Sequence, residues 1–184
     1  TDAFDFTKEN KVTRNAYGDT ETGRRMLTAR RLVERGVRFV QVWHNGWDHH
    51  TALKENLTTR ANEANQPIAA LLADLKERGM MDNTLVVVTG EFGRTPKVLT
   101  QKPPGRQHWP KCFSSILAGC GIGGGRVYGK SDKYGASVTN NPVRPEELAA
   151  TIYHALDIPL NDLQIDNAGG RPITTGKPVM ELFV

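Results

Sequence analysis

Short apolar runs rich in β-branched and aromatic residues alternate with stretches of helical periodicity along this chain. Three runs predict buried strands, and they are Val37–Trp43, Leu85–Thr89 and Phe113–Ala118. The second run is almost continuously apolar, which is typical of a parallel strand covered on both faces.

Between and after these runs, apolar residues recur at the spacing of amphipathic helices. The predicted helices are Thr20–Arg35, a stretch from about Thr51 to Arg78, and Glu146–Leu156. Asp48 or Thr51 is suited to cap the second helix, and Pro67 predicts a break within it. Pro145 is suited to open the third helix at its first turn.

The order of these elements, β-α-β-loop-β-α, predicts an α/β sandwich with a mostly parallel sheet between helices. The 184 residues are enough for one domain with a sizeable core, so we expect a single α/β domain over residues 1–184. Because the chain begins at Thr1 rather than at Met, we expect it to be part of a longer protein.

Composition narrows the classes of function. The net charge is +4 and the isoelectric point is about 9.2, but the basic residues are scattered among nearly as many carboxylates. Without a basic stripe interleaved with aromatic residues, we expect no nucleic-acid partner. No run reaches the ~20 apolar residues of a membrane span. The two cysteines, Cys112 and Cys120, form no C-x-x-C pair, which excludes a thiolate zinc site.

Three polar clusters lie beside the predicted strands. They are Trp47–His50, Glu91–Arg94 and Gly105–Trp109. In open α/β sheets, ligands bind outside the carboxyl ends of the strands. Carboxylates and imidazoles gathered there would supply the donor atoms that suit a divalent ion such as zinc or manganese.

Each candidate also has a structural alternative. Asp48 could cap a helix, with the adjacent histidines as surface residues. Glu91 could pair with Arg94 in a salt bridge, whereas as functional groups they would bind a metal and an anionic substrate group. His108 is either a ligand or an exposed loop residue, and His44 fits an ordinary core imidazole.

The clusters belong to a wider pattern that covers nearly the whole chain. Gly46–His50, Thr89–Pro96, Gly105–Pro110, Val127–Asp132 and Pro142–Ile152 together resemble the domain of unknown function 1501 family. That family is sulfatase-like and is grouped with the alkaline phosphatase superfamily. The resemblance implies an alkaline phosphatase/sulfatase-like sandwich, of which this chain would be the C-terminal part. It also implies export from the cytoplasm to the periplasm.

The superfamily resemblance implies a role for each candidate residue. Metal ligands would be Asp48, His50, Glu91 and His108, with His49 as an alternative ligand to His50 because the spacing from Asp48 is short. The metal would be zinc, manganese or calcium. Phe92 stands where a motif of the superfamily has its second metal ligand, and a phenyl ring cannot coordinate a metal.

The remaining roles concern the substrate. Arg94 and Arg106 would bind its anionic group, Arg94 also acting in catalysis by stabilising developing charge, and His49 would transfer a proton. The expected function is therefore divalent-metal-dependent hydrolysis of phosphate or sulfate esters, with a small-molecule or glycan ester as substrate. In the superfamily the nucleophile lies in the N-terminal half. The alternative is a catalytically inactive sulfatase-like domain that acts as a binding or structural module.

Overall fold

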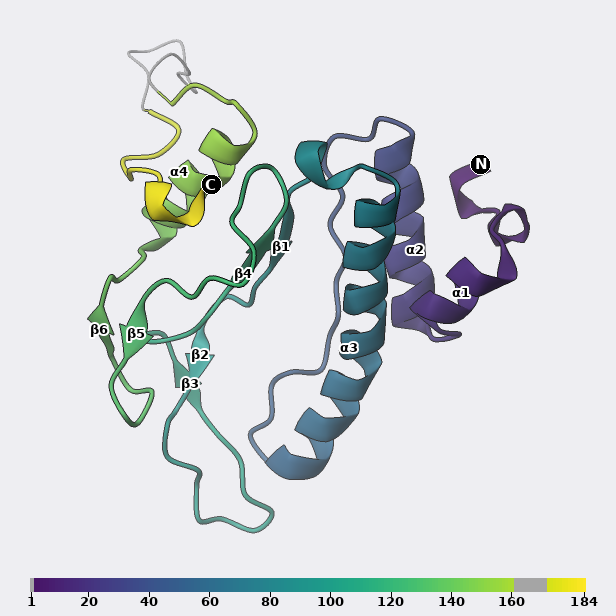
Figure 1. The fold of residues 1–184 in the computed structure, drawn as a ribbon. Coiled ribbons are helices and arrows are strands. Elements are labelled where there is room, and N and C mark those ends of the chain that lie inside the picture. The colour runs from purple at the N-terminus through teal and green to yellow at the C-terminus, as the bar shows by residue number, and fades with distance from the viewer. Residues whose placement is uncertain (1, 161–171) are drawn as a thin grey trace. The chain divides into compact units, whose positions relative to one another are not determined.

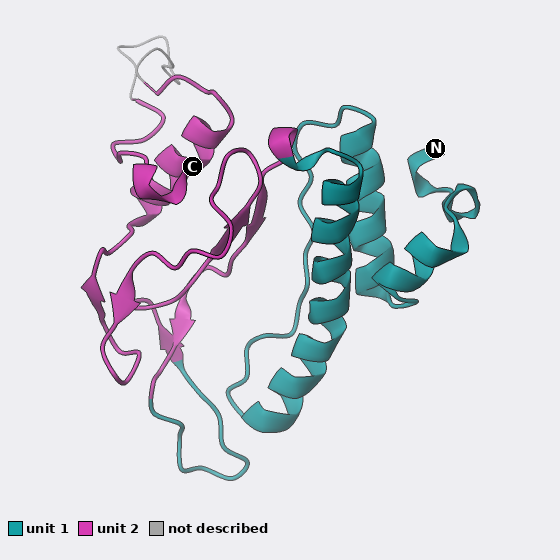
Figure 2. Ribbon diagram, in the orientation of Figure 1, with its two compact units in different colours: residues 1–81, 97–107 teal, residues 82–96, 108–184 magenta. Residues whose placement is uncertain are grey.

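The computed structural model describes residues 2–160 and 172–184 of the chain, and its internal contacts divide the chain into two units (Figure 2). Unit 1 comprises residues 1–81 and 97–107, and unit 2 comprises residues 82–96 and 108–184. The expectation of one domain over residues 1–184 stays a prediction.

Unit 1 is helical. Two 3-10 turns, Asp2–Phe4 and Phe6–Lys8, lead into α1 (Lys11–Tyr17), α2 (Glu21–Glu34) and α3 (Leu53–Glu77). Helices α1 and α2 pack on α3 (Figure 1). Tyr17, Leu27 and Leu75 are almost completely buried and form the centre of this packing.

A buried network of charges joins the N-terminal segment to α2 and α3. The Arg30 side chain is fully buried, and its guanidinium lies 2.7 Å from a Glu9 carboxylate oxygen and 2.8 Å from an Asp74 oxygen. Arg31 also pairs with Glu9, and the Tyr17 hydroxyl donates to Asp74 at 3.0 Å. Burial alone would raise the pKa of Glu9, but hydrogen bonds from the two arginines outweigh it and hold that pKa below its usual value.

The described residues of unit 2 form three short antiparallel strand pairs and one α-helix. The pairs are β1 (Val86–Val88) with β4 (Ile116–Ala118), β2 (Gly93–Arg94) with β3 (His108–Trp109), and β5 (Lys130–Ser131) with β6 (Val138–Asn140). Helix α4 spans Pro145–Ala155, and 3-10 turns cover Met81–Asn83, at the boundary between the units, and Met180–Leu182. The Thr151 hydroxyl on α4 accepts a hydrogen bond from the Val179 amide at 3.0 Å, which ties the chain end to the helix.

The prediction of an alkaline phosphatase-like α/β sandwich with a mostly parallel sheet was wrong. In the described part of the chain the sheets have two strands each, and every pair is antiparallel. The run Val37–Trp43 forms no strand. The Val37 amide donates back to the Leu32 carbonyl of α2 at 3.1 Å, no strand in the described part of the chain pairs with the run, and Phe39 and Trp43 are 80% and 66% exposed. A β-branched pattern favours extended backbone, but a strand also needs a partner.

The predicted helices are confirmed, with corrected boundaries. Thr20 caps α2 by accepting a hydrogen bond from the Gly23 amide at 3.0 Å, and Pro145 opens α4. Helix α3 runs unbroken through Pro67, and it begins after Ala52 rather than after a capping Asp48 or Thr51. A carbonyl from another segment replaces the side-chain cap, since the Leu53 amide donates to the Pro104 oxygen at 2.9 Å.

No helix in the described ranges combines the length and the apolar character needed to cross a bilayer.

Candidate functional site

The segment between α2 and α3 in unit 1 carries the first polar cluster and runs back along α3 (Figure 1). Within this cluster the His50 Nε2 and Asp48 Oδ1 atoms lie 2.9 Å apart. Both side chains are more than one-third exposed, at 38% and 57% respectively. The structure therefore brings together one imidazole nitrogen and one carboxylate oxygen, on residues two positions apart.

Residues 97–107 also belong to unit 1, and they donate hydrogen bonds to the backbone of this cluster. The Arg106 amide donates to the His49 carbonyl at 3.0 Å, and the Gln101 side-chain amide donates to the His50 carbonyl at 2.7 Å. Gly105 packs directly on the same backbone, because a Cβ atom at this position would collide with the carbonyl oxygen of His50. The first and third polar clusters, some 55 residues apart in sequence, are thus in direct contact through their backbones.

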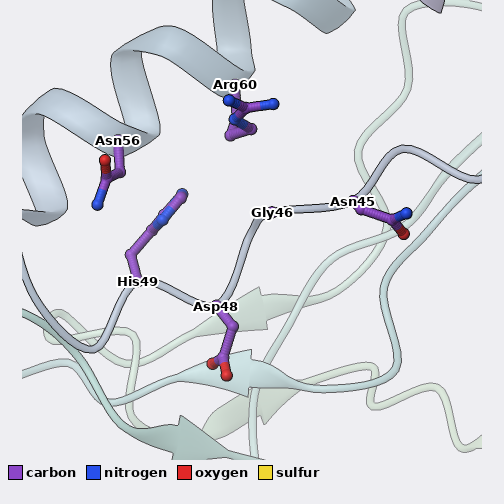
Figure 3. Close-up of a pocket in the computed structure, with 6 residues that line it drawn as sticks. All are labelled: Asn45, Gly46, Asp48, His49, Asn56 and Arg60. Carbon is purple, nitrogen blue, oxygen red and sulfur yellow. The ribbon is translucent and has the colours of Figure 1, made fainter.

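The side chains of Asp48 and His49 leave the loop in opposite directions (Figure 3). The imidazole of His49 points toward α3, between Asn56 and Arg60, and the residue is only 7% exposed. The carboxylate of Asp48 points away from that helix.

A pocket of about 420 Å³ lies beside this loop. Its lining residues are Asn45, Gly46, Asp48, His49, Asn56 and Arg60. They supply amides, a carboxylate, an imidazole and a guanidinium, with no apolar side chain. Such a lining suits a polar ligand rather than an apolar one.

A chain of hydrogen bonds fixes the start of the loop to α3. Trp47 Nε1 donates to His44 Nδ1 at 2.8 Å, so His44 must carry its own proton on Nε2, which lies 3.3 Å from a Glu63 oxygen. Arg60 holds the same Glu63 oxygen at 2.6 Å. Glu63 and Arg60 were not predicted from the sequence. The available signal was their i, i+3 spacing on one face of a predicted helix.

In unit 2, the candidate residues lie on and beside the β2–β3 pair. Arg94 and His108 are cross-strand partners in this pair. Phe92 lies against both, with its ring centroid 4.4 Å from that of His108 and 5.5 Å from the guanidinium carbon of Arg94. Glu91 is an exposed residue in the bend before β2.

The predicted site residues therefore fall into two groups, one in each unit. Unit 1 brings together Asp48, His49, His50 and the backbone of Arg106, and unit 2 brings together Arg94 and His108. The roles of these residues, and the role of Glu91 as a ligand, stay predictions.

Comparison with known proteins places the chain in a family. No curated protein and no solved structure matches it. The model of one family, described as a protein of unknown function (DUF1501), matches residues 1–183. Since this match covers almost every residue, the chain belongs to the DUF1501 family.

Proposed function

We propose that this protein is a divalent-metal-dependent hydrolase of phosphate or sulfate esters. Such a reaction adds water across an ester bond to phosphorus or sulfur and releases an alcohol and an inorganic anion. The proposal is supported chiefly by one observation, the close approach of the Asp48 carboxylate and the His50 imidazole in unit 1. The sulfatase-like resemblance of the sequence motifs supports the class of reaction.

The geometry of the Asp48–His50 pair fits two ligands of one ion. Zinc binds histidine nitrogen and carboxylate oxygen at about 2.0–2.2 Å, so two such ligands on a tetrahedral ion lie about 3.3 Å apart. The observed separation of 2.9 Å is close to that value and needs only a small side-chain adjustment. Oxygen and imidazole donors also suit manganese, and an oxygen-rich set would suit calcium. A bound ion would supply Lewis acidity toward the ester oxygen.

The protein's own residues would bind and orient the substrate. Arg94 and Arg106 offer guanidinium groups whose planar forks match the oxygens of phosphate or sulfate. His49, buried between the loop and α3, is the proposed proton carrier, and its ring already has a defined direction (Figure 3). Glu91 and His108 in unit 2 are the further proposed metal ligands.

The test is hydrolysis of p-nitrophenyl phosphate and p-nitrophenyl sulfate by the full chain, with added zinc, manganese or calcium and after chelation. We expect turnover that requires the ion and falls at least about 100-fold in Asp48→Ala. Asp19→Ala is the matched control, because Asp19 is a fully exposed carboxylate in the same unit and should keep activity. Turnover that survives both chelation and Asp48→Ala would contradict the proposal.

The second candidate function is a non-catalytic binding module that keeps the metal site. Phe92 favours it, because this residue replaces a metal ligand of the superfamily pattern with a group that cannot coordinate. Metal uptake that depends on Asp48, without hydrolysis of either ester, would support the binding module over the enzyme.

A further inference from the structure

The side chains of Phe92, Arg94 and His108 lie on one face of the β2–β3 pair. Side chains alternate between the two faces of a strand, so Phe92 and Arg94 point to the same side across Gly93. His108 is the cross-strand partner of Arg94 and therefore points to that side as well. The side-chain contacts agree, since the Phe92 ring centroid lies 4.4 Å from that of His108 and 5.5 Å from the guanidinium carbon of Arg94.

The opposite face of the pair is closed by packing. Gly93 and Trp109 are partners there, and a Cβ atom on Gly93 would collide with the Cys112 carbonyl oxygen. The Trp109 indole donates to the Ala136 carbonyl at 2.7 Å. The backbone under the three side chains is thus fixed by contacts on its opposite face.

We propose that Phe92 is a positioning residue that orients the imidazole of His108 and the guanidinium of Arg94. The tilt between the Phe92 and His108 rings is 41°, at a centroid distance typical of packed aromatic pairs. The Arg94 guanidinium lies within the range of a cation–π contact with the same phenyl ring. One side chain therefore restricts the rotamers of two others.

This inference rests on the proposed function, in which His108 is a metal ligand and Arg94 binds the anion. It also explains the departure of Phe92 from the superfamily pattern. A phenyl ring cannot supply a ligand atom, but it can hold a neighbouring ligand in one orientation. Partners of this kind, outside the ligand set, tune metal affinity strongly.

The first measurement reports on His108 without any metal. In proton NMR spectra of the full chain, the His108 ring protons should carry a ring-current shift from Phe92. Phe92→Leu should abolish this shift, and Phe92→Tyr should keep it because the ring stays. Phe183→Leu is the matched control, since Phe183 packs edge-on against His154 at 4.9 Å. It should move the His154 signals and leave those of His108 in place.

The second measurement reports on the consequence for metal binding. Cobalt(II) uptake, followed by its visible absorption, should weaken about ten-fold in Phe92→Leu and recover in Phe92→Tyr. Cobalt affinity should be lost in His108→Ala, the negative reference, and kept in Phe183→Leu, the positive reference.

The possible outcomes separate the two proposals. His108 signals that are identical in wild type and Phe92→Leu would overturn the inference, whatever metal is bound. A changed His108 signal with unchanged cobalt affinity would also overturn it, since Phe92 would then only fill space. A wild-type chain that takes up no cobalt would contradict the proposed function, while the ring-current shift still decides whether Phe92 orients His108.

Discussion

Glycine 105 shows how much a single residue contributes to the candidate site. Its lack of a side chain lets residues 97–107 lie on the backbone of the Asp48–His50 loop, where the Arg106 amide can reach the His49 carbonyl. The sequence motif pointed to this glycine only as part of a cluster. The contact that requires it links positions far apart in the chain, and no local pattern reveals such a contact.

We expect Gly105→Ala to destabilise the protein by about 1–3 kcal/mol, because the added methyl group must displace the His50 carbonyl or the returning segment. The free energy of unfolding from urea titration measures this effect. Gly124→Ala is the control, since a methyl group at Gly124 would meet nothing within 4 Å. Equal stability of the two variants would contradict the proposed packing.

At the scale of elements, the helices and two of the three expected strands could be predicted from sequence, but the pairing of the strands could not. Helical periodicity and capping are local, and Thr20 and Pro145 mark the starts of α2 and α4 as expected. Strand pairing depends on distant partners. Val37–Trp43 has the composition of a strand, but no described segment pairs with it, whereas Val86–Val88 pairs with Ile116–Ala118 in the antiparallel direction.

The buried charge network predicts how the helices of unit 1 respond to pH. The pKa of Glu9 is lowered in the folded protein from an ordinary value of 4.5. Glu9 therefore stabilises the fold above that value, and the contribution is lost as the pH falls from 4.5 through the lowered folded pKa. Glu9→Gln should cost about 3 kcal/mol at neutral pH, because it leaves buried arginine charge uncompensated.

Urea unfolding at about pH 7, 5 and 3 measures this dependence. Between pH 5 and pH 3, the free energy of unfolding should fall less in Glu9→Gln than in wild type. The reason is that glutamine cannot take up the proton that Glu9 binds when the protein unfolds. Glu21→Gln removes an exposed carboxylate that pairs with Arg25, and its free energy of unfolding should change with pH as in wild type. The same pH dependence in Glu9→Gln as in wild type would show that Glu9 is not among the groups that set acid stability.

At the scale of the whole molecule, the family could be predicted from the sequence and the sheet could not. The family follows from motifs spread along the chain and agrees with a match over residues 1–183. The Asp48–His50 pair lies within one loop, so its closeness could be anticipated. The contacts of that loop with Glu63 and Arg60 on α3 could not be anticipated. They depend on a hydrogen bond between His44 and Glu63, which lie 19 positions apart in the chain, and on the bond from Arg60 to Glu63.

Elemental analysis of the purified chain tests the central claim most directly, namely that Asp48 and His50 hold a divalent ion. We predict near-stoichiometric zinc, manganese or calcium that is lost in Asp48→Ala and in His50→Ala and kept in Asp19→Ala. Its affinity should fall as the pH drops, because protons compete with the ion for imidazole. A wild-type chain that neither contains nor takes up such an ion, or an Asp48→Ala chain that retains it, would contradict the account.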